Sequence, residues 1–226
     1  MELLSSFKHI GFPHLNDDDK LLIAKSVDML RICQKNFSHC FSHFLDERQI
    51  ALIKSFLAGN TNNCDNNDIV PAKINGADDV RFSFFGGYPD ASRKIMCAFH
   101  VSDNPALHDF PVSCLTFHFN ENFPLSHRDF LGAFMSLGIN RNTLGDILVS
   151  TGVAQAFTSS ASSLIITSEI KKIARTGVKI STDQDFFLSD CVKFIPISGT
   201  VSSLRLDALI SLALHMSRNK ALQLIN

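Results

Sequence analysis

Two stretches near the N-terminus repeat apolar residues with the period of an α-helix. The first covers residues 17–36 and starts with a run of three aspartates, which favours a helix N-terminus. The second begins after Asp46, which together with Gln49 matches a capping box, and Gly59 is expected to end it. The sequence therefore predicts a helical N-terminal region over residues 1–79.

A polar segment over residues 59–79 interrupts this periodicity. It contains six Asn, four Asp and two Gly, and these residues form turns more readily than helices or strands. Three runs rich in Val, Phe and Ile follow, which is the composition of strands: 80–87, 94–101 and 112–119. We therefore place a domain boundary in the polar segment.

From residue 112 onward the predicted elements follow the order of a split β-α-β fold. After the strand at 112–119 come a helix over 126–137, a hairpin over 146–157, a helix over 160–173 and a strand over 177–181. This order predicts a ferredoxin-like, RRM-like plait. We assign residues 80–182 to this plait.

The last part of the chain, residues 200–226, predicts two short helices. Leu206, Leu209 and Ile210 share one face of the first helix, and Ser217 occupies the N-cap position of the second. Together with the helical N-terminal region and the plait, this pair places the chain in the α+β class.

Composition and charge add two expectations. The 226 residues are 45% hydrophobic and include 20 Phe, one Tyr and no Trp, so the core must be rich in phenylalanine. The net charge of −1 lacks the basic balance that many nucleic-acid-binding proteins show. However, residues 1–125 carry 11 Lys and Arg against 15 Asp and Glu, whereas residues 126–226 carry 10 against 7. The C-terminal half is therefore the better surface for an anionic partner.

The cysteines and the apolar segments indicate a cytoplasmic protein. Six cysteines are spread through the chain without a CxxC pair, whereas a disulfide scaffold would be smaller and denser. We expect no signal peptide, because the first apolar stretch is short and runs into the acidic run at 17–19. The uncharged stretch 147–168 is half Ser, Thr, Gln and Gly, so we expect no membrane-spanning segment.

The motifs that could carry catalysis are each better explained otherwise. The HRD tripeptide at 127–129 lacks the later Asn of a kinase catalytic loop, and its Asp fits a capping box with Ser126. Gly86–Gly87 lacks the further glycines of a phosphate loop and predicts a tight turn. On a helix, His39 and His43 could share a metal, but packing against a phenylalanine-rich face is the preferred interpretation. We expect no enzymatic activity, no metal, no cofactor and no small-molecule substrate.

Four segments, taken in order, resemble the YlmH family. They are FLDERQ (44–49), FFGGYPDASRK (84–94), LSHRDFLGAFMSLGINRNTLGDILV (125–149) and TVSSLRLDALISLALHMSRNKALQLIN (200–226). This is a family of bacterial ribosome-associated RNA-binding proteins with an S-four domain, related to the photosystem II S-four domain proteins. The resemblance covers nearly the whole chain, and the last two segments are its most specific part.

The resemblance implies a three-part RNA-binding protein: a helical N-terminal region, a plait-type RNA-binding domain and a C-terminal S-four domain. It implies a ribosome quality-control factor that binds the large ribosomal subunit at rRNA and tRNA. Basic residues on rigid helices can follow a phosphate backbone. The expected RNA contacts are Arg205, Arg218, Lys220, Arg141, Arg128 and, through helix-start amides, Ser217. Asp207 is expected to pair with Arg205 or Arg218.

Two further expectations accompany the resemblance. In the family the SRxKA helix leads into a β-hairpin, whereas the sequence here stops at Asn226, so we expect a truncated S-four domain. The alternative function is a protein-interaction adaptor in cell division or photosystem assembly, which would bind its partner independently of salt. An RNA-modifying enzyme is a weaker alternative because the chain shows no catalytic constellation.

Overall fold

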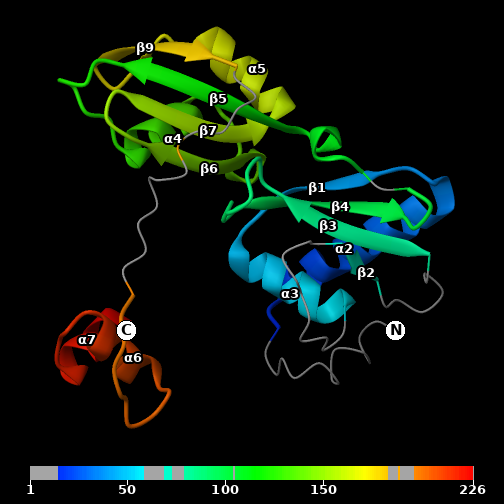
Figure 1. Ribbon diagram of the computed structural model, residues 1–226, viewed down its shortest axis with the longest axis horizontal. Helices are drawn as coiled ribbons and strands as arrows, with labels where there is room; N and C mark the ends of the chain where they lie inside the picture. The colour runs from blue at the N-terminus through cyan, green and yellow to red at the C-terminus, as the bar shows by residue number, and fades with distance from the viewer. Residues whose placement is uncertain are drawn as a thin grey trace. The chain divides into compact units, whose positions relative to one another are not determined.

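The structure is a computed structural model that describes residues 15–58, 69–72, 79–103, 105–182, 188 and 196–225 (Figure 1). The chain divides into two compact units, Met1–Cys191 and Val192–Asn226. The first unit holds two antiparallel sheets, and the second holds a pair of short helices. Within the described ranges, no helix has both the length and the apolar character needed to cross a bilayer.

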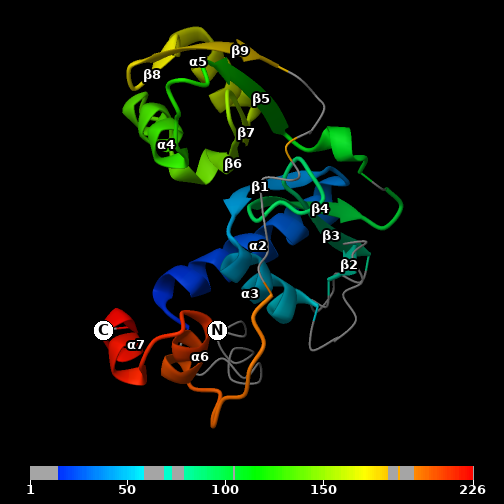
Figure 2. The same ribbon diagram turned by 60° about the vertical axis from the view of Figure 1, so that its left-hand side comes forward.

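The first unit begins with two helices and four strands: α2 (Asp17–Asn36), β1 (Cys40–Leu45), α3 (Glu47–Leu57), β2 (Val70–Pro71), β3 (Val80–Phe85) and β4 (Lys94–His100). The strands form a sheet in the order β1-β4-β3-β2, with α2 and α3 on one face (Figures 1 and 2). Ile23 of α2 and Ile53 of α3 are buried against Phe82 of the sheet. Arg48 also joins the two helices through two hydrogen bonds, of 2.6 and 2.8 Å, to the buried carboxylate of Asp19.

Both predicted N-terminal helices are present, and local capping explains where they begin. Asn16 caps α2 because its side chain accepts a hydrogen bond from the Asp19 N–H at 2.7 Å. In α3 the capping box forms completely: the Gln49 N–H donates to Asp46 Oδ1 at 2.8 Å, and the Asp46 N–H donates to Gln49 Oε1 at 3.0 Å. The expected stop, Gly59, and most of the polar segment after it lie outside the described residues.

The helix on which His39 and His43 could have shared a metal does not form, because His43 lies in β1, which pairs with β4, and His39 directly precedes this strand. The register of this pairing shifts between Phe41 and Phe44. Such a bulge inserts an extra residue, so both phenylalanines pack into one cluster with Phe99 and Phe110 although they are three residues apart. A spacing typical of a helix therefore arises here in a strand, and the N-terminal region is mixed rather than helical.

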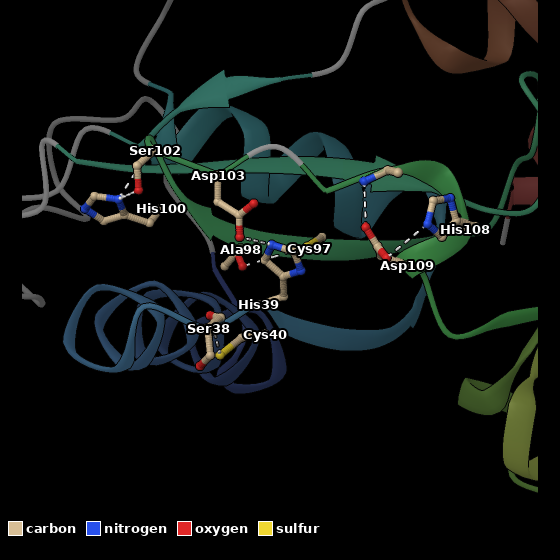
Figure 3. Close-up of polar contacts among 11 residues, drawn as sticks. Ser38, His39, Cys40, Cys97, Ala98, His100, Ser102, Asp103, His108 and Asp109 are labelled. Carbon is tan, nitrogen blue, oxygen red and sulfur yellow. Dashed lines mark hydrogen bonds and ion pairs between the residues drawn. The ribbon is translucent and has the colours of Figure 1, made fainter.

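His39, which directly precedes β1, and His43, within the strand, have different surroundings. The Nε2 atom of His39 lies 2.6 Å from Asp103 Oδ2 (Figure 3), and its ring packs edge-on against Phe41 with centroids 6.2 Å apart. His43 is exposed. The structure thus confirms packing against phenylalanine for His39. In the part of the chain that the structure describes, no three His, Cys, Asp or Glu side chains are grouped so as to hold a metal ion.

Two cysteines of this sheet-and-helix layer are expected to resist alkylation in the folded protein. Cys33 and Cys97 are fully buried, and burial raises the pKa of the Cys33 thiol to about 11 and that of Cys97 to about 12. Because the thiolate is the reactive form, iodoacetamide at pH 8 should modify both residues at least about 100-fold more slowly than in urea. Peptide mass spectrometry measures both rates, and equal rates would show that these thiols are open to solvent in the folded chain.

After residue 105 the first unit continues with a second sheet and the helices that accompany it. The elements in chain order are η2 (Leu107–Asp109), β5 (Val112–Phe119), α4 (His127–Ser136), η3 (Arg141–Thr143), β6 (Leu144–Val149), β7 (Val153–Ser159), α5 (Ser160–Glu169), β8 (Lys172–Ile173) and β9 (Thr176–Ser181). Its strand order is β6-β7-β5-β9-β8, and all neighbouring strands are antiparallel. Without the short edge strand β8, this is the predicted β-α-β-β-α-β plait. The structure therefore confirms the α+β class and the ferredoxin-like part of the prediction.

Two details of the second sheet differ from the prediction. The helix expected to reach residue 173 ends at Glu169, because Lys172–Ile173 pairs with β9 as strand β8. Strands β3 and β4, which the sequence analysis grouped with the plait, pair with β2 and β1 instead. Strand composition indicates that a segment is extended, but it does not specify the sheet that the strand joins.

Phenylalanine fills the core of the plait, as the composition predicts. Phe117 on β5 lies 5.2 Å from Phe130 and 5.8 Å from Phe134 between ring centroids, and all three rings are fully buried. Such aromatic pairs add about 0.5–1.5 kcal/mol beyond the burial of their surface. This packing fixes α4 on the sheet and so fixes the position of Arg128 at the start of that helix.

The second unit contains the two predicted C-terminal helices, α6 (Leu206–Ala213) and α7 (Arg218–Ile225). The turn between them includes His215 in the left-handed region at φ 49°. The prediction of a buried face containing Leu206 and Leu209 is wrong, because both side chains are exposed. Instead, the buried positions of the pair are Asp207 and Ala208 on α6 and Ala221 on α7.

Candidate nucleic-acid interface

One buried carboxylate joins the two helices of the second unit. Asp207 is only 4% exposed. Its Oδ1 accepts a hydrogen bond from Arg205 Nε at 3.0 Å, and its Oδ2 accepts from Arg218 Nε at 3.1 Å and Nη2 at 2.6 Å. The expectation that Asp207 pairs with Arg205 or Arg218 is confirmed, and the structure adds that it binds both at once. These three residues are called the Asp207 clamp below.

The Asp207 clamp leaves positive charge at the surface. Hydrogen bonds from Arg205 and then Arg218 lower the pKa of Asp207 to about 2, so the carboxylate is ionised at neutral pH. One negative charge thus faces two positive ones, and the side chains of Arg205 and Arg218 are 67% and 49% exposed. The carboxylate orients both guanidiniums, while their remaining N–H donors can bind phosphate oxygens.

Lys220 and Ser217 lie in the same unit and are both exposed. Lys220 is in the first turn of α7, and the carbonyl of Ser217 accepts a hydrogen bond from the Ala221 N–H at 3.0 Å. The first amides of a helix have no intrahelical acceptor, and they form the positive end of the helix dipole. The structure therefore gathers four of the six predicted contact residues in one unit of net charge +2 over residues 196–225.

The two plait arginines among the predicted contacts have different surroundings. Arg128 is exposed at the start of α4. Its neighbour Asp129 accepts hydrogen bonds from the N–H of Ser126 at 2.8 Å and from its Oγ–H at 2.6 Å, so the Asp of the HRD tripeptide serves helix capping. By contrast, Arg141 in η3 is half-buried, and its Nη1 donates to the carbonyl of Leu144 at 3.1 Å.

Arg141 lies where two of the segments that carry the family resemblance meet. Arg93, from the loop before β4, donates from Nε to the Leu144 carbonyl at 2.9 Å. Its Nη2 donates to the carbonyls of Arg141 at 3.3 Å and Phe44 at 3.4 Å. We call this region, where the loop 86–94 meets η3 and the start of β6, the junction.

Asp146 of β6 holds the other side of the junction. Its carboxylate accepts hydrogen bonds from Tyr88 Oη at 2.8 Å and from the backbone N–H groups of Ser92 at 2.7 Å and Arg93 at 3.2 Å. Burial and this hydrogen bond raise the pKa of Tyr88. One side chain of the plait therefore binds three residues of the loop that leads into β4.

Two glycines allow the close approach of backbone at the junction. Gly87 has φ +105°, and a Cβ atom there would overlap the ring of Phe157 on β7. A Cβ atom at Gly145 would lie 2.7 Å from Phe44 Cε1. The tight turn predicted for Gly86–Gly87 is thus also a packing contact between the first sheet and the plait.

The sheet face of the plait that is opposite α4 and α5 is covered at its centre. The register pairs Thr116 with Gln155 and Cys114 with Phe157, which places all four on this face. Thr116 and Gln155 are fully buried, and Phe157 is 1% exposed. Gln155 Oε1 also accepts a hydrogen bond from the backbone N–H of Leu188 at 3.2 Å. At these central positions Phe157 is therefore not available for an RNA base to stack on.

Two comparisons with known proteins concern the amino-acid sequence. Residues 105–185 match the family model described as "Putative RNA-binding domain in YlmH", and this range holds η2 and β5 to β9. Over 219 residues the chain is 26% identical to "Ribosome-associated protein quality control protein P2" of Bacillus subtilis (strain 168), which covers 95% of this chain and 77% of that protein.

A solved structure, "Cell division protein ylmH from Streptococcus pneumoniae", has the same fold. The match has a TM-score of 0.58 at 18% identity, and it covers 76% of this chain and 94% of that chain.

Arg93, Asp146 and the packing role of Gly87 were not among the site residues predicted from the sequence. Arg93 and Gly87 lie in the FFGGYPDASRK segment and Asp146 in the GINR-x3-GDI element, both of which support the family resemblance. Their position in these two elements was the signal by which the sequence could have pointed to them. Their partners, however, lie about fifty residues away along the chain, which no local pattern reveals.

Proposed function

Since the chain belongs to the YlmH family, we propose that it is an RNA-binding protein that docks on the large ribosomal subunit at rRNA and tRNA. It acts in the cytoplasm by binding alone, without catalysing a reaction. The proposed contacts are Arg205, Arg218, Lys220, Arg141, Arg128 and the helix-start amides after Ser217. The relative of Bacillus subtilis named as a ribosome-associated quality control protein supports a role at the ribosome.

The Asp207 clamp is the observation that carries this proposal. Long arginine side chains lose conformational freedom when they bind, at a cost of about 0.5–1.5 kcal/mol each. The buried carboxylate already holds Arg205 and Arg218 in position, yet it neutralises only one of their two charges. The clamp is therefore a preorganised cationic surface, which suits a phosphate backbone better than an apolar protein partner.

The covered sheet face of the plait supports the same kind of recognition. Its central positions, including Phe157, are buried, so this face offers no phenylalanine platform for base stacking, and the proposed contacts of the plait are cationic side chains. Phosphate contacts fix position and orientation and carry little sequence information. The protein would therefore recognise the shape of a structured RNA, as expected for a factor that docks on a ribosomal surface.

We expect the chain to co-sediment with large ribosomal subunits at low salt and to dissociate steeply as salt rises. Each phosphate contact contributes about −0.7 to −0.9 to the slope of log Kobs against log[salt], so five cationic contacts predict a slope of about −4. Sedimentation at several KCl concentrations measures it. A slope near zero would contradict RNA docking and would favour the adaptor alternative, in which a protein partner is bound independently of salt.

A further inference from the structure

The junction contains two guanidiniums that have no carboxylate partner among the described residues. Arg93 Nε and Arg141 Nη1 both donate to the same acceptor, the Leu144 carbonyl, at 2.9 and 3.1 Å. Their other acceptors are also backbone carbonyls: Phe44 and Arg141 for Arg93, and Gly145 for Arg141. Among the described residues, no Asp or Glu oxygen lies within 4.0 Å of either guanidinium.

The positive charges of Arg93 and Arg141 are not fully compensated by neighbouring acids. Both side chains are half-buried, and burial lowers the pKa of each arginine, with the charge of Arg141 lowering that of Arg93 further. The charges of Asp46 and Asp146 act in the opposite direction without offsetting this lowering, and the oxygens of Asp146 already accept hydrogen bonds from Tyr88, Ser92 and the Arg93 backbone. Two partly desolvated like charges held on one carbonyl repel each other unless an anion compensates them.

Several donors of the pair are unused. In the part of the chain that the structure describes, Arg93 Nη1 and the Nε and Nη2 atoms of Arg141 make no hydrogen bond. A guanidinium is planar, and its fork of N–H groups matches the oxygens of a phosphate. The bonds to the carbonyls hold both forks in place, so the ligand does not have to order them on binding.

We propose that Arg93 and Arg141 form a site for one phosphate group of the RNA backbone, held at the junction between the first sheet and the plait. This inference rests on the proposed RNA-binding function and deepens it, because it adds Arg93 as a contact and gives Arg141 a partner. It also explains why two sequence elements far apart in the chain meet here: together they build the anion site. RNA bound at the junction would contact both sheets of the first unit.

The first test uses inorganic phosphate and the full chain. At constant ionic strength, replacing chloride by phosphate should raise the melting temperature of the wild-type first unit by about 2–4 °C, since a ligand that binds only the folded state stabilises it. Arg93→Gln and Arg141→Gln should lose most of this rise. Arg81→Gln, at an exposed position on β3, is the matched control and should keep it. An equal rise in all four proteins would overturn the site.

The second test uses RNA and separates this inference from the proposed function. With a fluorescently labelled 20-nucleotide oligouridine and with large ribosomal subunits, Arg93→Gln and Arg141→Gln should each reduce the salt slope by about 0.7, and Arg81→Gln should not. If the wild type binds neither probe, the proposed function fails, and the phosphate shift alone decides the anion site. If the wild type binds and the slopes of both variants are unchanged, the junction does not contact RNA and the inference fails.

A pair of lysine variants covers the case in which the glutamine variants do not fold. Arg93→Lys and Arg141→Lys keep the charge but lose the planar fork. They should retain the wild-type salt slope within about 0.3 and lose about half of the phosphate-induced rise in melting temperature. A full phosphate response in both lysine variants would contradict binding by the guanidinium forks.

Discussion

Replacing Gly87 with alanine is expected to lower the stability of the first unit by about 3 kcal/mol. An alanine at a positive φ costs about 1–2 kcal/mol, and Gly87 has φ +105°. Its Cβ atom would also overlap the Phe157 ring, which is buried and cannot move away, and overpacking of this kind costs about 1–3 kcal/mol more. Thermal or urea unfolding followed by circular dichroism measures the loss, which corresponds to about 10 °C in melting temperature.

Gly138 provides the matched control for this substitution. It also has a positive φ, +74°, but a Cβ atom there would meet nothing within 4 Å. Gly138→Ala should therefore show only the conformational cost, about 1 kcal/mol. Hydrogen exchange at the amides of Ser92 and Arg93, which donate to Asp146, should rise in Gly87→Ala and not in Gly138→Ala. Equal destabilisation by both substitutions would show that the contact with Phe157 contributes nothing.

Elements defined by local patterns could be predicted from the sequence, whereas elements defined by distant partners could not. The helices α2 and α3 were predictable because their caps and apolar stripes are local, as the capping box of Asp46 and Gln49 shows. Strand β1 was not, because its bulge between Phe41 and Phe44 exists only through pairing with β4. The membership of β3 and β4 in the first sheet is likewise decided by partners, and strand propensity does not encode partners.

The residues of the candidate site likewise divide into those whose contacts could be predicted from the sequence and those whose contacts could not. The pairing of Asp207 was predictable from residues two and eleven positions away, and both Arg205 and Arg218 take part. That no described acid pairs with Arg93 or Arg141 was not predictable, since it depends on which carbonyls and carboxylates fold around them. A single arginine in a sequence could equally be a solvated surface charge. Only its surroundings show whether its charge is compensated.

Asp207→Asn should weaken binding to large ribosomal subunits by roughly tenfold, although it makes the protein more positive. Arg205 and Arg218 would lose the carboxylate that orients them, and each freed side chain costs about 0.5–1.5 kcal/mol to order on binding. Simple electrostatics predicts the opposite sign, because removing a negative charge should strengthen attraction to phosphates. Affinity measured by sedimentation at fixed KCl therefore distinguishes preorganisation from net charge.

Two control variants separate the effect of net charge on RNA binding from the effect of orienting the arginines. Asp18→Asn, at an exposed position of α2, adds the same charge without touching the clamp and should leave binding unchanged or slightly tighter. Lys220→Gln removes a charge outside the clamp and should reduce the salt slope by about 0.7. Tighter binding of Asp207→Asn than of the wild type would show that Asp207 only weakens the positive field and does not preorganise the site.

The pH dependence of the helix pair tests the same clamp in the absence of RNA. The folded-state pKa of Asp207, about 2, lies below its ordinary value near 3.8, so the clamp stabilises the folded state fully above about pH 4. This contribution is lost as the pH falls through about 2, where the carboxylate takes up a proton and releases both arginines. Amide NMR signals of α6 and α7 in the wild-type chain should therefore broaden or shift between pH 4 and pH 2. In Asp207→Asn the same signals should already be perturbed at pH 7 and should change little with acid, because asparagine has no proton to gain.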